Sequence, residues 1–446
     1  MSDRTVSRRD FVRAAGAGAL ATGLGANIIV PGRARAAKTL KILQWVHFVP
    51  AYDEWFNKKY VKEWGAKNDT EVIVDNIGLA QINARATAEV SAGKGHDIVQ
   101  FNWPPPSFEQ QVVPMNDVYQ ELERKLGKPI DLCVKSTYNP KTKTYYALSP
   151  SFTPDPVNYR QDLFGQVGLP TGPKSWDEVR SAGAKIKKDT GHPVGIGLAQ
   201  EIDTAMAMRT IMYAWGAHEQ DEAGNLVLKS KQTLDALRFV KALYDETMTA
   251  EVFTWDASSN NRAMLAGKAS LALNAISITR TAEKENPEMS RQIQLTKALR
   301  GPVRAIGLEH VMQCSVVWKF AENVEGAKKF LIDYTTSFHD AFVAGEFYDF
   351  PCFPKTVPDL SKLIANDPKA HPPDKYKVLD DVLNWATNVG YPGYATAAID
   401  EVYSTWMLNT MFGKVAAGQA TPEAALDEAE AACKRIFGKW KEKGLV

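Results

Sequence analysis

The sequence predicts an α/β protein with more than one domain. Its 446 residues exceed what a single hydrophobic core supports, so two or three domains are expected. After residue 38, strand-like apolar segments alternate with amphipathic helical ones, which is typical of a parallel sheet covered by helices. The stretch Tyr145–Tyr159, YYALSPSFTPDPVNY, then carries three prolines, so it is unsuited to be a central strand over its whole length. We interpret it as an extended connection that crosses a hinge between two lobes, beside a cleft that is the working site.

The first 36 residues have the features of an export signal rather than of a folded element. A charged start is followed by a weakly apolar run and by Ala34-Arg35-Ala36, an A-x-A site for signal peptidase. The pair Arg8-Arg9 before a Gly- and Ala-rich run resembles a twin-arginine signal, and an ordinary secretory signal with a chance arginine pair is the alternative. We therefore expect a periplasmic protein, and no later stretch is apolar over the roughly 20 residues that a membrane anchor needs.

Charge argues against nucleic acid as a partner. Removal of residues 1–36 takes away six Arg and two Asp and leaves 47 basic and 50 acidic residues, a net charge of −3. A mildly acidic chain without a basic stripe is not typical of nucleic-acid binding.

The four cysteines are Cys133, Cys314, Cys352 and Cys433. An oxidising compartment permits disulfides, but the sequence leaves three pairings open and the spacing matches no metal motif. Cys433 lies on an apolar helical stripe, which favours a core position.

Alternating elements continue along the whole chain. Strands are predicted at 39–46, 71–74, 97–101, 195–200, 269–274 and 292–298, with a long extended segment at 306–317. Helices are predicted at 52–64, 81–90, 176 onward, 233–245, 261–265 and 324–334, with a long one around 399–406 and a last one from 421. Ser175 and Glu178 form a predicted capping box, and Pro422 stands at a first helical position.

Four segments in this order match one known family: PKSWDEV (173–179), AMLAGKASLALNA (263–275), NVEGAKKFLIDYTT (323–336) and AAGQATPEAALDEAEAACKRI (416–436). Together they resemble the extracellular solute-binding proteins of ABC importers, in the branch similar to maltose-binding protein. The resemblance covers essentially the whole mature chain. It implies an α/β two-lobe periplasmic-binding-protein fold with hinge crossings and a ligand cleft between the lobes.

The resemblance also implies domain boundaries. Lobe one is expected at 37–149 plus 309–346, and lobe two at 154–304 plus 352–446. The crossings are expected near 148–153, 305–309 and 347–351, and two of these are proline-rich.

A small carbohydrate or polyol, delivered to the permease subunits of the importer, is the expected solute. Aromatic rings suit the flat faces of a sugar, and amides or carboxylates suit its hydroxyl pairs. From the loops expected at the cleft, the candidate ligand-binding residues are Trp45, His47, Asn102, Trp103, Asp155, Glu201, Asp203, Asn274, Ser277, Glu309, His310, Tyr391 and Tyr394.

Several candidates have a structural alternative. Trp45 suits a core position, Glu309 and His310 suit backbone groups of the hinge, and Tyr391 with Tyr394 suits a plain turn around Pro392. Trp103, followed by three prolines, has no evident place to bury, which favours the cleft. Maltodextrin binders carry a Trp just after the LALN-equivalent strand, whereas this chain has Ala275-Ile276-Ser277, so the solute stays open.

Other function classes have less support. The chain has no G-x-S-x-G, H-E-x-x-H or phosphate-loop motif, so an exported carbohydrate-active enzyme is the weaker alternative. A binder of polyamines or phosphate esters would be marked by clustered acids or arginines, which one sequence cannot show. We expect a monomer without cofactor, metal or catalytic residues.

Overall fold

A four-stranded mixed sheet organises the first part of the protein. The computed structural model describes residues 38–446, and the predicted export signal lies outside them. β1 (Lys38–Trp45) pairs in parallel with both β2 (Thr70–Ile77) and β3 (Ile98–Phe101), as the alternation of elements predicted. β12 (Cys314–Val317) then returns from far along the chain and pairs antiparallel with β3.

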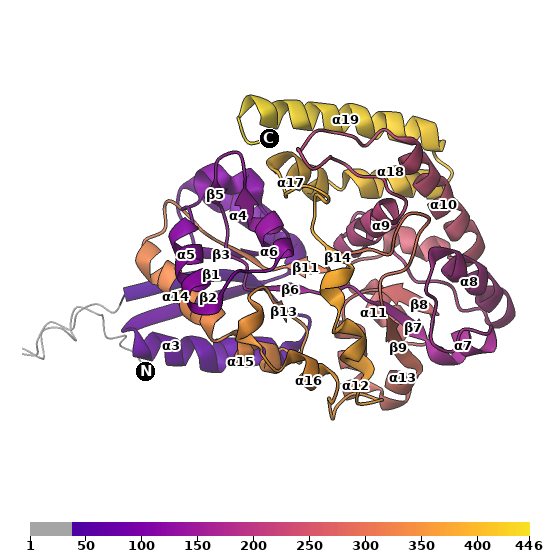
Figure 1. Ribbon diagram of the computed structural model, residues 1–446, viewed down its shortest axis with the longest axis horizontal. Coiled ribbons are helices and arrows are strands. Elements are labelled where there is room, and N and C mark those ends of the chain that lie inside the picture. Colours follow the sequence, from indigo (N-terminus) through magenta and orange to yellow (C-terminus); the bar gives the residue numbers. More distant parts are fainter. Residues whose placement is uncertain (1–37) are drawn as a thin grey trace, which may run out of the picture. The chain divides into compact units, whose positions relative to one another are not determined.

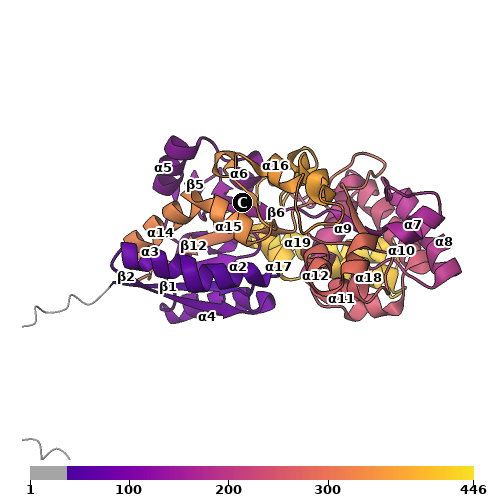
Figure 2. The ribbon, with the colours of Figure 1, turned by 90° about the horizontal axis from the view of Figure 1, so that it is seen from below.

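Helices cover both faces of this sheet. α3 lies on one face and α4 on the other (Figures 1 and 2). The predicted helix at 52–64 is continuous through a π-helical turn, and its aromatic side chains Tyr52, Phe56 and Trp64 are buried. The elements of this part are α2 (Pro50–Trp55), the π-helical turn (Phe56–Tyr60), α3 (Val61–Lys67), α4 (Ile82–Ala92), α5 (Asn116–Leu126), α6 (Asp131–Thr137), β4 (Tyr138–Asn139), β5 (Thr144–Tyr145), α14 (Val324–Thr336) and α15 (Phe338–Ala344).

The proline-rich stretch forms two short strands, and each is the central strand of a small sheet. β6 (Ser151–Thr153) lies between β11 (Val311–Met312) and β13 (Phe350–Pro351), and β7 (Val157–Arg160) lies between β8 (Leu271–Leu273) and β9 (Ile293–Thr296). Central strands are possible here because the three prolines of the stretch flank the paired residues and remove no ladder donor.

The sheet around β6 joins three distant segments of the chain. β6 lies inside the crossing predicted near 148–153, and β13 lies inside the one near 347–351. β11 begins two residues after the crossing predicted near 305–309. β10 (Gly307–Leu308), inside the crossing predicted near 305–309, pairs in parallel with β14 (Ala386–Thr387) in a separate two-stranded sheet. Two of the predicted crossings, 148–153 and 347–351, are therefore hydrogen-bonded to each other through β6 and β13.

The second part of the protein is mainly helical. The capping box is confirmed, because Ser175 Oγ accepts from Glu178 N (3.2 Å) and Glu178 Oε2 accepts from Ser175 N (3.2 Å). The helices are α7 (Gln161–Gln166), α8 (Trp176–Thr190), α9 (Ile202–Ala214), α10 (Lys231–Thr247), α11 (Ser259–Leu265), α12 (Ser277–Glu285), α13 (Pro287–Gln292), α16 (Leu360–Ile364), α17 (Ala397–Ser404), α18 (Met407–Ala416) and α19 (Pro422–Glu442).

Short 3-10 helices join several of these elements. They span Leu79–Gln81, Pro106–Gln111, Ala250–Thr254, Pro354–Thr356, Lys375–Leu379 and Val382–Asn384. No helix within residues 38–446 has the length and hydrophobicity that a membrane crossing requires.

Two predicted elements are wrong. Residues 195–200 form no strand, because Gly195 N donates to Leu271 O and Leu198 N donates to Val252 O, two unrelated segments that cannot form one ladder. The long helix around 399–406 is two helices, because Trp406 adopts a left-handed conformation (φ 56°) that ends α17 before α18 begins.

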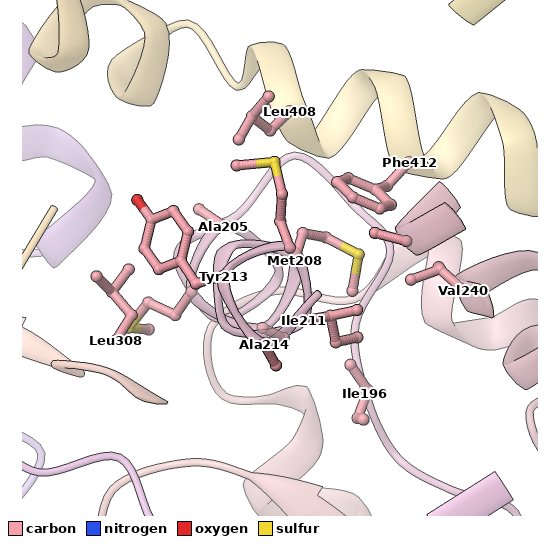
Figure 3. Close-up of a cluster of buried hydrophobic side chains, with 14 of the residues drawn as sticks. Ile196, Ala205, Met208, Ile211, Tyr213, Ala214, Val240, Leu308, Leu408 and Phe412 are labelled. Atoms are coloured by element: carbon pink, nitrogen blue, oxygen red, sulfur yellow. The ribbon is translucent and has the colours of Figure 1, made fainter. Parts of the chain in front are cut away.

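Buried apolar side chains form two large cores. One surrounds the first sheet, and the other surrounds α9, all of whose residues are buried. Figure 3 shows α9 end-on, with Val240, Leu408 and Phe412 on neighbouring helices directed toward it. Apolar side chains between Cys352 and Trp385 pack in the first core, although we assigned residues 352–446 to the second lobe. The exact lobe boundaries stay a prediction.

Candidate functional site

Eleven of the thirteen candidate residues are buried, and several of them meet near the crossing sheet. The buried ones are Trp45, His47, Asn102, Trp103, Asp155, Glu201, Asp203, Asn274, Ser277, Glu309 and His310, and the half-buried ones are Tyr391 and Tyr394. The loops that follow β3, β6, β8 and β10 supply Asn102, Asp155, Asn274 and Glu309. Four of the candidates thus follow strands and lie in a polar region near the crossing sheet.

His310 lies between two carboxylates. Its Nδ1 is 3.1 Å from Asp155 Oδ1, and its Nε2 is 4.0 Å from Asp203 Oδ1. Asp155 follows β6, His310 follows β10, and Asp203 stands in the first turn of α9. Three segments far apart in sequence thus bring a titratable ring and two carboxyl groups together.

Asp203 is held by Asn260, which the sequence analysis did not select, and by the candidate Asn274. Asn260 Nδ2 donates to Asp203 Oδ2 (2.6 Å), and Asn274 Nδ2 donates to Asn260 Oδ1 (2.7 Å) and Asn261 Oδ1 (2.7 Å). Ser277 Oγ donates to Asn274 Oδ1 (3.3 Å), so this candidate belongs to the same network. Two adjacent asparagines, Asn260 and Asn261, before the predicted LALN strand are the sequence feature that could have pointed to this network.

Glu201 acts as the N-cap of α9. Its two carboxylate oxygens accept from the backbone N–H of Asp203 (2.7 Å) and of Thr204 (2.6 Å). Burial raises the pKa of Glu201, and burial with the charges of Glu201 and Asp155 raises the pKa of Asp203. Glu201 therefore positions Asp203, while its own oxygens are already occupied.

Glu309 is buried with one oxygen unused. Its Oε1 accepts from Val389 N (3.1 Å), a backbone group outside the three predicted crossings, and Oε2 has no hydrogen-bond partner. Burial raises the pKa of this carboxyl to about 8. A carboxyl of this kind is a donor when protonated and an unpaired charge when ionised.

Arg209 and Tyr403 adjoin these carboxyl groups and were both missed. Arg209 Nε donates to Glu219 Oε1 (2.6 Å), and the guanidinium carbon lies 4.5 Å from the centroid of the Tyr403 ring. The charges of Glu309 and Asp203 contribute, after burial, to the raised pKa of Tyr403. Arg209 sits inside a helical pattern of apolar residues, where sequence reasoning gave it no special role.

His47 connects the first sheet to the crossing. Its Nε2 contacts Asp349 Oδ2 (3.0 Å), whose Oδ1 accepts from Thr153 Oγ1 (2.8 Å). The Trp45 ring stacks on His47, with centroids 4.9 Å apart, and is itself buried in the first core. Tyr348, whose ring centroid is 5.0 Å from His47, is fully buried with no partner for its hydroxyl.

Trp103 is buried, although the sequence analysis found no evident place for it to bury. The side chain is only 6% exposed and packs in the second core, with its ring centroid 5.4 Å from Tyr403. Its Nε1–H donates to Asp400 Oδ1 (2.9 Å), and Ser107 N donates to Asp400 Oδ2 (3.1 Å). The prolines carry the indole onto α17, a surface that local sequence could not reveal.

Tyr391 and Tyr394 contact residues outside this polar region. The Tyr391 hydroxyl accepts from Arg304, and its ring lies 5.5 Å from that of Tyr213. The Tyr394 ring lies 6.2 Å from that of Tyr138. Tyr213 in turn donates from its hydroxyl to Glu219 Oε2 (3.0 Å), the carboxylate that also binds Arg209.

Several buried polar atoms near the crossing have no hydrogen-bond partner. They include both amide atoms of Asn102, Asp203 Oδ1, Glu309 Oε2 and the Tyr348 hydroxyl, together with Ser151 Oγ on β6 and Arg209 Nη2. Buried polar groups are nearly always hydrogen-bonded, so an unpartnered set of this kind requires an explanation. Within residues 38–446, no group of three or more His, Cys, Asp or Glu is placed to hold a metal ion.

Comparison with known families gives an assignment. The model of the bacterial extracellular solute-binding protein family matches residues 59–372, more than half of the chain. The chain belongs to this family. The family is one of binding proteins, in agreement with the expectation of a binder rather than an enzyme.

The chain matches only about half of the length of its curated relatives. A putative binding protein of Brucella abortus (strain 2308) is 26% identical over 252 residues, 55% of this chain and 60% of that relative. The arabinooligosaccharide-binding protein of Bacillus subtilis (strain 168) is 25% identical over 203 residues, 44% of this chain and 46% of that relative.

Solved structures of solute-binding proteins share the fold. The maltose-bound MalE3 of T. maritima superposes with a TM-score of 0.75 at 18% identity, covering 90% of this chain and 100% of that one. A solute-binding protein of Agrobacterium radiobacter K84 in complex with ribitol has a TM-score of 0.74 at 18% identity, covering 90% and 99%. The two-lobe α/β periplasmic-binding-protein fold is confirmed.

Proposed function

We propose that this protein is the substrate-binding component of an ABC importer. It captures a small carbohydrate or polyol in the periplasm and delivers it to the membrane permease. The export signal belongs to the same proposal, with the twin-arginine route favoured by the weak apolar run after Arg8-Arg9.

Family membership and the ligands of similar proteins support this class of solute. Among the structures with this fold, one is bound to maltose, one to ribitol and one to tagatose. A curated relative binds arabinooligosaccharides by name. The shared chemistry of these ligands is a row of hydroxyl groups on a short carbon frame.

The observation that carries the proposal is the set of unpartnered polar atoms near the crossing sheet. Asn102 follows a strand of the first sheet, Asp203 begins a helix of the second core, and Glu309 and Tyr348 adjoin the crossing strands. A solute with several hydroxyls would supply the missing partners to groups from both sides. Trp103 would close over the same region by its contact with α17.

A thermal-shift screen of the purified exported protein tests the proposal. The panel contains maltose, tagatose, ribitol, arabinobiose, spermidine and glucose 6-phosphate, and specific binding raises the melting temperature with ligand concentration. We expect stabilisation by at least one sugar or polyol without turnover. Stabilisation by the phosphate ester alone, or chemical conversion of a sugar, would contradict the proposal.

Asn102→Leu sharpens this test. The substitution removes both unpartnered amide atoms at similar volume, so it should abolish the ligand-induced shift while leaving the empty protein at least as stable. Asn57→Leu, on the helical segment of the first part, is the matched control and should leave the ligand-induced shift intact.

A further inference from the structure

The polar region is rich in carboxyl groups, and most of its cations are already paired. We call Asp155, Asp203 and Glu309 the carboxylate cluster. All three are buried, and the charge of Asp155 contributes to the raised pKa of both Asp203 and Glu309, after burial as the first cause. Asp155 and Asp203 contact opposite nitrogens of the His310 ring, at 3.1 Å and 4.0 Å, and Glu309 precedes His310 in the chain, so the cluster gathers acids around one histidine.

The cluster retains acceptor atoms that nothing in residues 38–446 occupies. Asp203 Oδ1 and Glu309 Oε2 are buried without a hydrogen-bond partner. The Tyr348 hydroxyl is an independent sign of an incomplete site, because this side chain is 0% exposed and its hydroxyl is also unpartnered. The Tyr348 ring lies 5.0 Å from that of His47, whose partner Asp349 accepts from Thr153 on β6, beside the crossing strands. Burial raises the pKa of Tyr348, and the charges of Asp349, Asp203 and Asp155 raise it further.

Positive charge near the cluster is insufficient to balance it. Arg209 Nε donates to Glu219 Oε1 (2.6 Å), so these two charges largely balance, while Arg209 Nη2 stays buried without a partner. Burial raises the pKa of Glu309, and the charge of Arg209 lowers it in part. His310 offers at most one positive charge, and it lies 3.1 Å from Asp155 but 4.0 Å from Asp203. The other titratable groups that face the cluster are His47, Glu201, Tyr348, Asp349 and Tyr403.

A hydroxyl group and an ammonium group would satisfy this region differently. A neutral hydroxyl forms a hydrogen bond with a carboxyl group in either protonation state, but it brings no charge and so does nothing to favour the ionised form that burial and the neighbouring acids disfavour. An ammonium group supplies the hydrogen bond and the compensating charge together, and charge-assisted hydrogen bonds are the stronger kind.

We propose that the solute is a polyhydroxylated amine, such as an amino sugar or an amino polyol, whose ammonium group binds at Oδ1 of Asp203. Asp155 supplies surrounding negative charge, and Glu309, which is protonated at neutral pH in the empty protein, releases its proton to solvent when the ammonium group binds. The asparagine network beside Asp203 accepts from and donates to neighbouring hydroxyls. This inference rests on the proposed function, because it takes the polar region as the solute site of the binding protein.

Matched pairs of small molecules test the inference by calorimetry on the exported protein. The pairs are D-glucosamine with D-glucose, and 1-amino-1-deoxy-D-sorbitol with D-sorbitol, and N-acetyl-D-glucosamine removes the charge while keeping the nitrogen. We expect the amine of a pair to bind about tenfold or more tighter than its partner, a difference of about 1.4 kcal/mol. An equal or tighter affinity for the neutral partner overturns the inference.

Charge-matched variants locate the preference. Asp203→Asn should shrink the amine-to-hydroxyl affinity ratio, whereas Asp427→Asn, which removes an exposed carboxylate on α19, should retain it. If Asp203→Asn does not fold, the amine-to-hydroxyl affinity ratio is measured on Glu309→Gln instead, which should also shrink it. Retention of the full ratio in both cluster variants overturns the assignment.

Failure of the inference is distinguishable from failure of the proposed function. Tight binding of a neutral sugar with no gain from an amine leaves the proposed function standing and removes the inference. Binding of spermidine with no affinity for any sugar or polyol, charged or neutral, overturns both, because the hydroxyl-binding role would be absent.

Discussion

Replacement of Trp103 by Phe tests whether the indole–Asp400 contact stabilises the closed, ligand-binding state. Trp103 follows β3 of the first sheet, whereas Asp400 lies on α17 and the indole packs in the second core, 297 residues away in sequence. Phe keeps an aromatic ring in this position but cannot donate to Asp400 Oδ1. The variant therefore removes one hydrogen bond between the two parts with little loss of apolar burial.

The structure sets the size of the effect. A hydrogen bond to a charged group contributes about 1.5 to 3 kcal/mol. Asp400 keeps the donors Ser107 N (3.1 Å) and Ser107 Oγ, so the lower end of that range applies. A loss of about 1.5 kcal/mol corresponds to roughly tenfold weaker apparent affinity if binding requires the contact.

Calorimetric titration with the best solute of the panel measures this loss. Trp176→Phe is the matched control, because that indole is buried in the same core and its Nε1 has no hydrogen-bond partner. We expect roughly tenfold weaker binding for Trp103→Phe and near-native binding for the control. Equal affinities of the two variants would refute a role of the Asp400 contact in closure.

Two further predictions concern pH and export. Burial raises the folded-state pKa of Glu309 from 4.5 to about 8, so between these values the folded protein binds more protons than the unfolded chain, and the free energy of unfolding should fall as pH rises through this window. Denaturant unfolding of the empty protein at pH 5 to 8 should show this fall, and Glu309→Gln should reduce it; an identical pH profile would contradict the assigned burial. Replacement of Arg8 and Arg9 by Lys should leave the precursor in the cytoplasm on cell fractionation, and undiminished export would exclude the twin-arginine route.

Local patterns in the sequence predicted most of the fold. The strand at 39–46, the helix at 52–64 and the capping box at Ser175 are confirmed because each depends on periodicity or on neighbours three residues apart. Residues 195–200 were misread because their backbone groups pair with two separate segments. The break at Trp406 was missed because a left-handed backbone conformation is rare for a residue other than glycine, so residue type gave no sign of it.

The candidate site was only partly accessible to sequence reasoning. Asp155, Asp203 and His310 were selected from loops after predicted elements, and the structure brings them within hydrogen-bonding range of one another or nearly so. Arg209 and Tyr348 were missed because their importance depends on which side chains the tertiary fold places beside them. The excess of buried acid likewise arises from segments distant in sequence, which no local pattern reports.

Small-angle X-ray scattering with and without solute tests the central claim most directly. A binding protein that closes about its crossing strands should show a smaller radius of gyration when the tightest solute of the panel is saturating. The account predicts this compaction for the native protein, and it predicts that Asn102→Leu shows none at the same solute concentration. An unchanged scattering curve of the native protein at proven saturation would contradict the account.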